Sequence, residues 1–380
     1  MATLLISMDF PPHKDGITTL AKELAEHLSL DHEDTFIVIG PSAKNDFKYD
    51  QTHKFKIYRS PLYDYGYIKL IPLLFIVPYV VIKHKINKII ATNVGYGGFI
   101  AVLLKTFLKL DYIVTAQGYE FMKFKDNVLV RKIYSHVYRN AHAIVTCSQY
   151  VKKLLLEFGA KNNKIIVVYP GVDTSFFKPL KVPDAFLNKY SLKNRKILLS
   201  VSRLVHRKGH DMVLDALPTV AQKIPEILYI IVGKGPEKNR LEKIIKNKKL
   251  DPYVLFTDEI SNSDLQFFYN CSNVFIMPSR EVDSDGHVEG FGIVFIEANA
   301  CGKPVIGGRS GGIPEAIVNG KTGFLVDPEN SADIADKITN LLCNNDLSSE
   351  MGQFALQYVK EHFSWNDYTN EFKKLLSEMK

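Results

Sequence analysis

Residues 196–237 read KILLSVSRLVHRKGHDMVLDALPTVAQKIPEILYIIVGKGPE, and this stretch decides the fold. An apolar run, KILLSVS, is followed by a polar loop and a segment of helical length. A second apolar run, LYIIVG (228–233), then ends in a glycine turn. Short strands that alternate with helices form parallel sheets with crossover helices. The stretch therefore predicts one strand–helix–strand unit of an α/β domain.

The same alternation occurs in both halves of the chain. In the second half it continues through YVLFT (253–257), NVFIMPS (273–279), KPVIGG (303–308) and GFLV (323–326). In the first half the corresponding runs are TLLISM, TFIVIG, KIIAT, YIVTA and AIVTCS. We therefore predict two Rossmann-like, doubly wound α/β domains that face each other across a cleft. The carboxyl ends of strands line such a cleft, and these folds bind ligands there.

A stretch with three prolines and no clear period, residues 169–194, separates the two series of strands and is typical of a domain linker. We place an N-terminal domain at residues 1–185 and a C-terminal domain at residues 186–360. The last residues, 361–380, have the pattern of an amphipathic helix, which we expect to pack back on the N-terminal domain.

The composition fits a globular protein with enough apolar material for two cores, since 46% of the 380 residues are hydrophobic. The net charge of +7 is uneven: residues 1–190 carry 25 Lys and Arg against 16 Asp and Glu, and residues 191–380 carry 23 against 25. The chain has no dense basic block with interleaved aromatic residues, which argues against nucleic acid as a partner. The basic N-terminal half instead favours a membrane surface or a phosphorylated acceptor.

Cysteine usage and the N-terminus bear on location. Cys147, Cys271, Cys301 and Cys343 lie far apart and form no C-x-x-C pair, so the sequence predicts neither a disulfide framework nor a zinc site. The N-terminus MATLLISMDF lacks the basic region that opens a signal peptide. We therefore expect a cytoplasmic protein, with peripheral contact at the inner face of a membrane as a further option.

The longest apolar run, Leu70–Ile82, is shorter than the roughly 20 residues that span a bilayer, and it contains Pro72 and Pro78. Lysines flank it on both sides. An interfacial helix and a buried crossover helix are both compatible with this pattern, and the buried helix is the preferred interpretation.

The first strand is followed by DFPPHKDG (9–16), which lacks the G-x-G-x-x-G of a dinucleotide site and so disfavours an NAD-linked dehydrogenase. Pro11 and Pro12 stiffen this turn, and Gly16 would let backbone amides approach an anion at the start of the next helix. A plain strand-to-helix turn explains the same residues.

The polar loop SRLVHRKG (202–209) places Arg203 and Lys208 after a strand. Two fixed cations there would bind a diphosphate and stabilise the charge that a leaving nucleoside diphosphate gains, without a metal ion. Solvated surface charges are the alternative interpretation. After the next strand, Gly233 and Gly235 would allow close backbone approach to a ligand, although a tight turn into a helix at Pro236 explains them equally well.

The most informative stretch is EGFGIVFIEA (289–298), in which Glu289 and Glu297 stand eight residues apart around a probable helix start. Eight residues are slightly more than two helical turns, so both carboxylates can face one ligand. A carboxylate accepts two hydroxyl hydrogen bonds, which suits a ribose diol at Glu297 and sugar hydroxyls at Glu289. Gly290 and Gly292 would expose backbone N–H groups at the helix start to sugar or phosphate oxygens.

With these stretches, together with YPGVD (169–173) and the closing FSW, the sequence resembles the family 4 retaining glycosyltransferases over most of its length. That family has the two-domain fold of glycogen synthases, known as GT-B. Within it the sequence looks most like the enzymes that mannosylate phosphatidylinositol, which share a similar first turn and an extended loop before the first Glu.

The resemblance implies that Arg203 and Lys208 bind the donor diphosphate and that Glu297 binds the ribose. Glu289, with the amides of Phe291 and Gly292, would hold the transferred sugar, and Ile293 would also bind the donor. Glu289, Arg203 and Lys208 would form the catalytic set. Gly16 would lie near the β-phosphate, and Gly233 and Gly235 would border the donor. Pro12, Asp15 and Gln117 would contact the acceptor or the sugar. No cofactor and no metal ion are implied, because the nucleotide sugar is a substrate.

Two positions depart from the family pattern. Gln117, in TAQGYE (115–120), stands where the family commonly has His, and Asp15–Gly16 stands where Gly-Gly is usual. Gln hydrogen-bonds a sugar hydroxyl but does not shuttle protons, so either this His is dispensable or the sugar or activity differs.

The sequence thus predicts a metal-independent retaining hexosyltransferase, with GDP-mannose or a UDP-hexose as donor and a lipid-linked or glycan acceptor. A non-catalytic sugar-nucleotide binder and a UDP-sugar epimerase of related fold are the alternatives. Two further patterns have plain explanations. DSD (283–285) imitates a metal-binding motif but lies in a loop, and SGGIPE (310–315) fits an ordinary helix entry.

Overall fold

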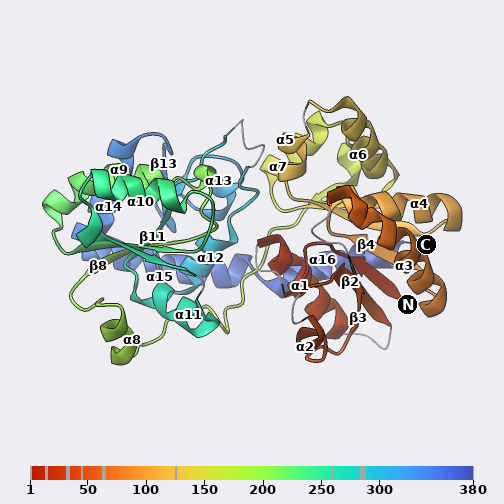
Figure 1. Cartoon of the computed structure of the whole chain (residues 1–380), viewed down its shortest axis with the longest axis horizontal. Coiled ribbons are helices and arrows are strands. Elements are labelled where there is room, and N and C mark those ends of the chain that lie inside the picture. Colours follow the sequence, from red (N-terminus) through yellow and green to blue (C-terminus); the bar gives the residue numbers. More distant parts are fainter. Residues whose placement is uncertain are drawn as a thin grey trace. The chain divides into compact units, whose positions relative to one another are not determined.

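The structure, a computed structural model, describes residues 2–12, 16–30, 35–43, 46–61, 66–124, 126–258, 260–282 and 288–379. The chain forms two compact units (Figure 1). The first comprises Met1–Gly171 together with Trp365–Lys380, and the second comprises Val172–Ser364.

The described part of the first unit contains a seven-stranded sheet in which all neighbouring strands are parallel. In spatial order its strands are β3 (Lys56–Ser60), β2 (Phe36–Pro41), β1 (Thr3–Ile6), β4 (Lys88–Ala91), β5 (Asp111–Ala116), β6 (Ala143–Thr146) and β7 (Ile165–Val167). Its helices are α1 (Gly16–Leu30), α2 (Asp46–Asp50), α3 (Leu70–His84), α4 (Phe99–Leu108), α5 (Tyr119–Lys123), α6 (Val128–Asn140), α7 (Gln149–Glu157) and α16 (Trp365–Glu378).

The second unit repeats this architecture with a six-stranded parallel sheet in its described part. The spatial order is β10 (Val254–Thr257), β9 (Ile227–Val232), β8 (Lys196–Val201), β11 (Val274–Met277), β12 (Val305–Gly308) and β13 (Gly323–Val326). Its helices are α8 (Asp184–Lys189), α9 (His210–Lys223), α10 (Lys238–Asn247), α11 (Asn262–Cys271), α12 (Ile293–Ala300), α13 (Ile313–Ala316), α14 (Ser331–Cys343) and α15 (Asn345–His362).

The strands form because their apolar runs are buried on both faces, as in other parallel sheets covered by helices. Every residue of β1, β4, β9 and β11 is buried. In the second unit, α9, α10 and α14 cover one face of the sheet and α11 and α12 cover the other (Figure 1). The prediction of two Rossmann-like, doubly wound domains is confirmed.

In both sheets the strand order reverses direction at one point, between β1 and β4 in the first and between β8 and β11 in the second. Doubly wound sheets bind ligands outside the carboxyl ends of the strands at this switch point. In the second unit, a ligand site is therefore expected at the loops after β8 and β11.

The boundary between the units lies at Gly171/Val172, whereas the sequence placed it near residue 185. The proline-rich stretch belongs to the second unit because it packs on α11. Phe177 lies 5.5 Å from Tyr269, ring centroid to ring centroid, and the Leu180 amide donates to Asn270 Oδ1 at 2.8 Å. The second unit extends to Ser364. The final helix, α16, lies in the first unit and contacts α1.

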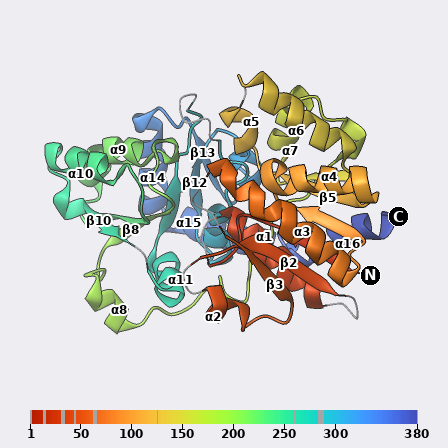
Figure 2. The ribbon, with the colours of Figure 1, turned by 45° about the vertical axis from the view of Figure 1, so that its right-hand side comes forward.

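The apolar run at Leu70–Ile82 forms most of α3, which lies beside α4 (Figures 1 and 2). The preferred interpretation, a buried helix, is only half right. Leu73, Val77, Val80 and Val81 are buried, whereas five large apolar side chains on the other side are exposed. In the described part of the chain, no helix combines the length and apolar character needed to cross a membrane.

Candidate functional site

The loops at the carboxyl ends of β8, β9 and β11 are tied together through their backbones. The Leu204 amide, after β8, donates to the Lys234 carbonyl, after β9, at 2.9 Å. The Arg280 amide, after β11, donates to the Arg207 carbonyl at 2.8 Å. The loop that holds Arg203 and Lys208 is therefore fixed from both sides at the switch point of the second sheet.

Gly233 and Gly235 are required by this close packing of loops. A Cβ atom on Gly235 would lie 2.1 Å from the Leu204 carbonyl oxygen, and one on Gly233 would lie 2.0 Å from the Ser202 carbonyl oxygen. Both distances are far below van der Waals contact. The glycines thus have a structural explanation, and their predicted role beside the donor stays a prediction.

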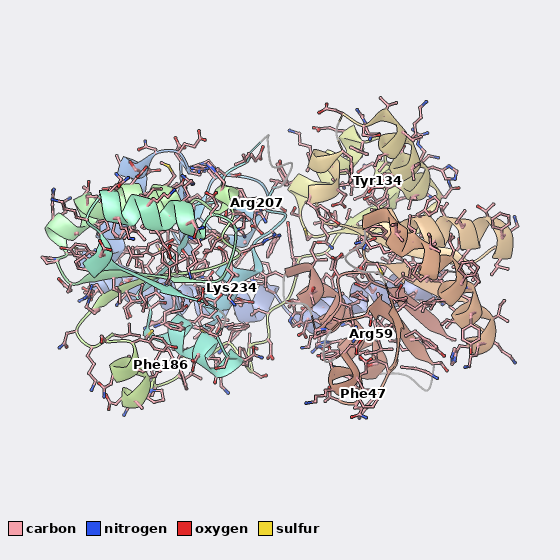
Figure 3. All side chains as sticks on the ribbon, in the orientation of Figure 1. Phe47, Arg59, Tyr134, Phe186, Arg207 and Lys234 are labelled. Atoms are coloured by element: carbon pink, nitrogen blue, oxygen red, sulfur yellow. The ribbon has the colours of Figure 1, made fainter. Side chains whose placement is uncertain are left out.

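Glu289 lies between two cations of the loop after β8. Its Oε2 atom accepts hydrogen bonds from Lys208 Nζ at 2.5 Å and from Arg207 Nη1 at 2.9 Å (Figure 3, where Arg207 is labelled). Its backbone is also fixed, because its carbonyl accepts from the Gly312 amide at 2.9 Å. Both cations share Oε2, and among the described residues none hydrogen-bonds Oε1. One carboxylate oxygen is therefore fixed by two cations.

Electrostatics keep this cluster ionised. Burial alone would raise the pKa of Glu289, but Lys208 and Arg207 outweigh it and lower the pKa to about 2. Burial lowers the pKa of Lys208, and Glu289 opposes that shift. The side chains of Lys208 and Glu289 are only 10% and 15% exposed. In such a poorly hydrated place a fixed charge acts on a ligand more strongly than it does in water.

Arg203 differs from Lys208, although both were predicted to bind a diphosphate. Its side chain is exposed, and within the described part of the chain it makes no hydrogen bond or ion pair. The structure thus brings Lys208 and Glu289 together and leaves Arg203 extended into solvent from the same loop.

The loop after β8 is braced by a second buried cluster around Asp211, which the sequence did not indicate. Asp211 Oδ2 accepts from Arg280 at 2.7 Å and from Arg240 at 2.9 Å. Burial would raise the pKa of Asp211, but the two guanidinium groups lower it. Arg280 also contacts His206 at 2.6 Å. These contacts join the first turn of α9 to α10 and to the loop after β11.

Glu297 lies in the second turn of α12 and accepts a hydrogen bond from the Tyr269 hydroxyl at 2.6 Å. Burial raises the pKa of Glu297 to about 7, and the Tyr269 hydrogen bond opposes this shift. Helical winding begins at Ile293, so Glu289 stands before the helix rather than on it.

The start of α12 connects the two glutamates. Gly292 is the N-cap of the helix and has a φ of 93°, which favours glycine. A Cβ atom there would lie 3.8 Å from Glu289 Cγ and 2.7 Å from the Phe295 ring. Phe291 is buried, and its ring centroid lies 5.6 Å from that of Phe363. The first amide groups of α12, including that of Ile293, therefore begin close to Glu289.

In the first unit, the carbonyl of Pro11, next to Pro12, accepts from Arg59 at 2.7 Å (Figure 3). Gly16 is the first residue of α1, and a Cβ atom there would meet nothing within 4 Å. Asp15 lies outside the described residues. Gln117 follows β5: its amide N–H donates to Glu120 at 2.9 Å, and its side chain donates to Thr115 Oγ1 at 3.2 Å.

The remaining motifs have simple outcomes. DSD (283–285) lies outside the described residues, and within those residues no group of three or more acidic, His or Cys side chains could hold a metal ion. SGGIPE leads into α13, as expected for a helix entry. The four cysteines are free thiols.

The sequence reasoning missed Arg207 and Tyr269. Arg207 is adjacent to Lys208 in the loop, so its position in the sequence was a usable signal. Tyr269 lies on α11, 28 residues before Glu297, and nothing in the sequence connects the two.

The two Rossmann-like units have the GT-B fold, which a large class of glycosyltransferases shares. Residues 14–176 match the model of Glycosyltransferase Family 4, and residues 184–358 match that of Glycosyl transferases group 1. Between them the two models span most of the chain, and the chain belongs to this family of glycosyltransferases.

Among curated proteins, the chain is 28% identical to the GDP-mannose-dependent alpha-(1-6)-phosphatidylinositol monomannoside mannosyltransferase of Mycolicibacterium smegmatis, over 98% of each chain. Among solved structures, HepE of Anabaena in complex with UDP and glucose has a TM-score of 0.83 at 18% identity over 99% of each chain. Sucrose-phosphate synthase of Thermosynechococcus elongatus has a TM-score of 0.82 at 19% identity, over 99% of this chain and 98% of that one. At such identities the two structural matches bear on the fold alone.

Proposed function

We propose that this glycosyltransferase transfers a hexose, with retention and without a metal ion, from a nucleoside diphosphate sugar to a hydroxyl of a lipid-linked or glycan acceptor. The observation that carries the proposal is the Glu289 carboxylate, which Lys208 and Arg207 fix through one oxygen and whose other oxygen has no hydrogen bond within the described residues. The full-length similarity to a GDP-mannose-dependent enzyme supports mannose as the sugar and GDP-mannose as the donor.

In this reaction the bond between the sugar and the leaving phosphate breaks, and negative charge grows on the diphosphate. Lys208 and Arg203 would stabilise that charge, since preorganised cations act most strongly where charge develops in the transition state. Glu289 Oε1 would accept a hydrogen bond from a sugar hydroxyl, and Glu297 would hold the ribose. The leaving phosphate would take the proton of the acceptor hydroxyl on the same face of the sugar, so no protein nucleophile is needed.

A lipid-linked acceptor stays in its bilayer, so the proposal includes a peripheral position at a membrane, on the cytoplasmic side. The lipid substrate that the name of the Mycolicibacterium relative gives supports this choice. The free thiols agree with a reducing compartment.

The test is a donor screen with the whole protein, in which GDP-mannose and several UDP-hexoses are supplied with and without lipid extract and free nucleotide is measured. We expect GDP release from GDP-mannose, unchanged by a chelator, and an anomeric configuration in the product that matches the donor by NMR. Turnover of uridine sugars alone would overturn mannose as the sugar, and loss of activity with the chelator would overturn metal independence.

Two other outcomes of this experiment would show that the protein is not a transferase. Tight donor binding by calorimetry without transfer or hydrolysis would identify a sugar-nucleotide binder. This alternative is motivated by Gln117, which stands where the family commonly has His. Interconversion of the free UDP-sugar without an acceptor would identify an epimerase.

A further inference from the structure

We propose that the outward side of α3 is a docking surface that inserts into an anionic lipid bilayer. This surface, the α3 outer face, consists of Ile71, Leu74, Phe75, Tyr79 and Ile82. The inference builds on the proposed lipid-linked acceptor, because it identifies the part of the molecule that would meet the membrane holding that acceptor.

The α3 outer face is a continuous apolar stripe. Its residues recur at intervals of three and four, which places them on one side of a helix. Phe75 is 73% exposed and Ile82 is 71% exposed. The opposite side of the helix packs into the unit through Leu73, Val77, Val80 and Val81. A helix on the surface of a water-soluble domain normally carries polar residues outside, whereas this second apolar side is exposed and unpacked within the described residues.

The neighbouring helix also exposes apolar side chains. α4 lies beside α3 in both views (Figures 1 and 2), and at its C-terminal end Phe107 is 77% exposed and Leu108 is 46% exposed. Apolar exposure in this part of the first unit is therefore not confined to one side chain.

Charge identifies the partner. Residues 65–110 contain no Asp or Glu but contain six lysines. Lys83, Lys85 and Lys109 are exposed, and Lys83 Nζ lies on the α3 outer face, where it donates to the Tyr79 hydroxyl at 2.7 Å. Apolar side chains with exposed lysines beside them fit an anionic bilayer, where the rings enter the acyl boundary and the lysines meet the headgroups. A second copy of this chain would instead place lysines against lysines.

The geometry fits a helix that lies in the interface rather than one that spans it. α3 has 15 residues, which corresponds to a length of about 22 Å, and the hydrocarbon core of a bilayer is about 30 Å thick. Its inner side is already packed against the first unit. Only the outer face can enter lipid, to a depth of about one side chain.

The experiment is sedimentation of the full chain with vesicles of phosphatidylcholine alone or with 30% phosphatidylglycerol. The test variant is the double substitution Phe75→Gln/Ile82→Gln. Its matched control is Phe47→Gln on α2, which removes a phenyl ring that is 69% exposed elsewhere in the same unit. A second pair compares Lys83→Gln/Lys85→Gln with Lys243→Gln/Lys246→Gln on α10.

We expect the wild-type chain to bind the anionic vesicles, Phe75→Gln/Ile82→Gln to lower the partition coefficient at least tenfold, and Phe47→Gln to leave it unchanged. The Lys83/Lys85 variant should bind weakly and lose the preference for anionic lipid, and the Lys243/Lys246 variant should bind like the wild type. Thermal melting should be the same for all five proteins.

Wild-type protein that stays in the supernatant, or apolar variants that bind as well as wild type, would overturn the proposal. A dimer in ultracentrifugation that Phe75→Gln/Ile82→Gln dissociates would assign the face to a second copy instead. Donor hydrolysis in solution is measured in parallel. Its absence would contradict the proposed function without touching vesicle binding, whereas normal hydrolysis without vesicle binding would contradict only this inference.

Discussion

The two sheets share the strand order around their switch points, yet the residues at their carboxyl ends differ in kind. In the second unit the edge is ionic: Lys208 and Arg207 hold Glu289 in a buried cluster. In the first unit a chain of neutral hydrogen bonds joins the strand ends, beside two carboxylates: Glu120 accepts from the Gln117 amide and Asp9 accepts from Asn93. Gln117 donates to Thr115 at 3.2 Å, Thr115 donates to the Thr92 carbonyl at 2.8 Å, and Thr92 donates to Ser7 at 2.8 Å.

In the proposed function this contrast corresponds to different roles for the two edges. A diphosphate requires fixed positive charge, which the second edge provides, whereas sugar hydroxyls are satisfied by neutral donors and acceptors such as those of the first edge. Removing a group from the ionic edge should therefore cost more activity than removing one from the neutral edge.

The largest effect is expected for Lys208→Ala, which should lower kcat about a hundredfold, as the loss of a transition-state charge contact does. The loss also leaves Glu289 with Arg207 as its remaining partner. Steady-state kinetics with the best donor measures it, with Lys243→Ala as the control for removal of a lysine from the same unit. Unchanged kinetics in Lys208→Ala would remove this residue from the mechanism.

The next comparison uses one glycine from each edge. Gly235→Ala should lower the free energy of unfolding by about 1–3 kcal/mol, because its Cβ atom would lie 2.1 Å from the Leu204 carbonyl oxygen and the loops must move apart. Gly16→Ala has open space and should leave stability unchanged or slightly higher. Denaturant unfolding of both variants tests this. Equal stability of the two would show that the second edge is less tightly packed than its contacts imply.

The fold could be predicted because each strand is a short apolar run bounded by polar residues, as in LYIIVG for β9. The boundary between the two units could not be predicted from the sequence. The Pro-rich stretch packs through Phe177 and Leu180, and their partners lie on α11, about 90 residues later. Likewise the apolar run at α3 shows that the helix is hydrophobic, but only the packing shows which side is left exposed.

For the site, the sequence placed Lys208 and Glu289 in one ligand-binding group, and the structure puts them in contact. It could not show that Arg203 is exposed while Arg207 is half-buried against Glu289, because adjacent basic residues look alike until the loop is folded. The hydrogen bond between Tyr269 and Glu297 joins two helices, and such pairs leave no local pattern.

The two glutamates at the second edge differ in their pKa. The pKa of Glu297 is raised to about 7, whereas that of Glu289 is lowered to about 2. The raised pKa means that ionisation of Glu297 costs folding free energy as pH rises from about 4.5 to 7. In the proposed function the ionised carboxylate accepts two ribose hydroxyls, so the donor KM should fall about tenfold as pH rises through 7. Kinetics between pH 5.5 and 8.5 measure this change.

The matched variant is Glu297→Gln, which keeps the shape of the side chain and does not titrate. Its donor KM should resemble the low-pH value of the wild type at every pH, and Glu297→Ala should raise KM further with little change in kcat. A wild-type profile that Glu297→Gln reproduces would assign the titration to another group, such as the donor phosphates.

The smallest effect is expected at the neutral edge. Gln117→Ala removes one neutral side-chain hydrogen bond, to Thr115, and one possible bond to a sugar hydroxyl, so kcat/KM should fall only about two- to tenfold. Gln117→His restores the residue common in the family and should keep activity within the same range, because the leaving phosphate takes the proton in the proposed reaction. Steady-state kinetics at saturating donor check both variants. A gain of a hundredfold or more in Gln117→His would mean that a proton-carrying side chain is needed at this edge, and the ionic and neutral edges would then no longer divide the work as argued.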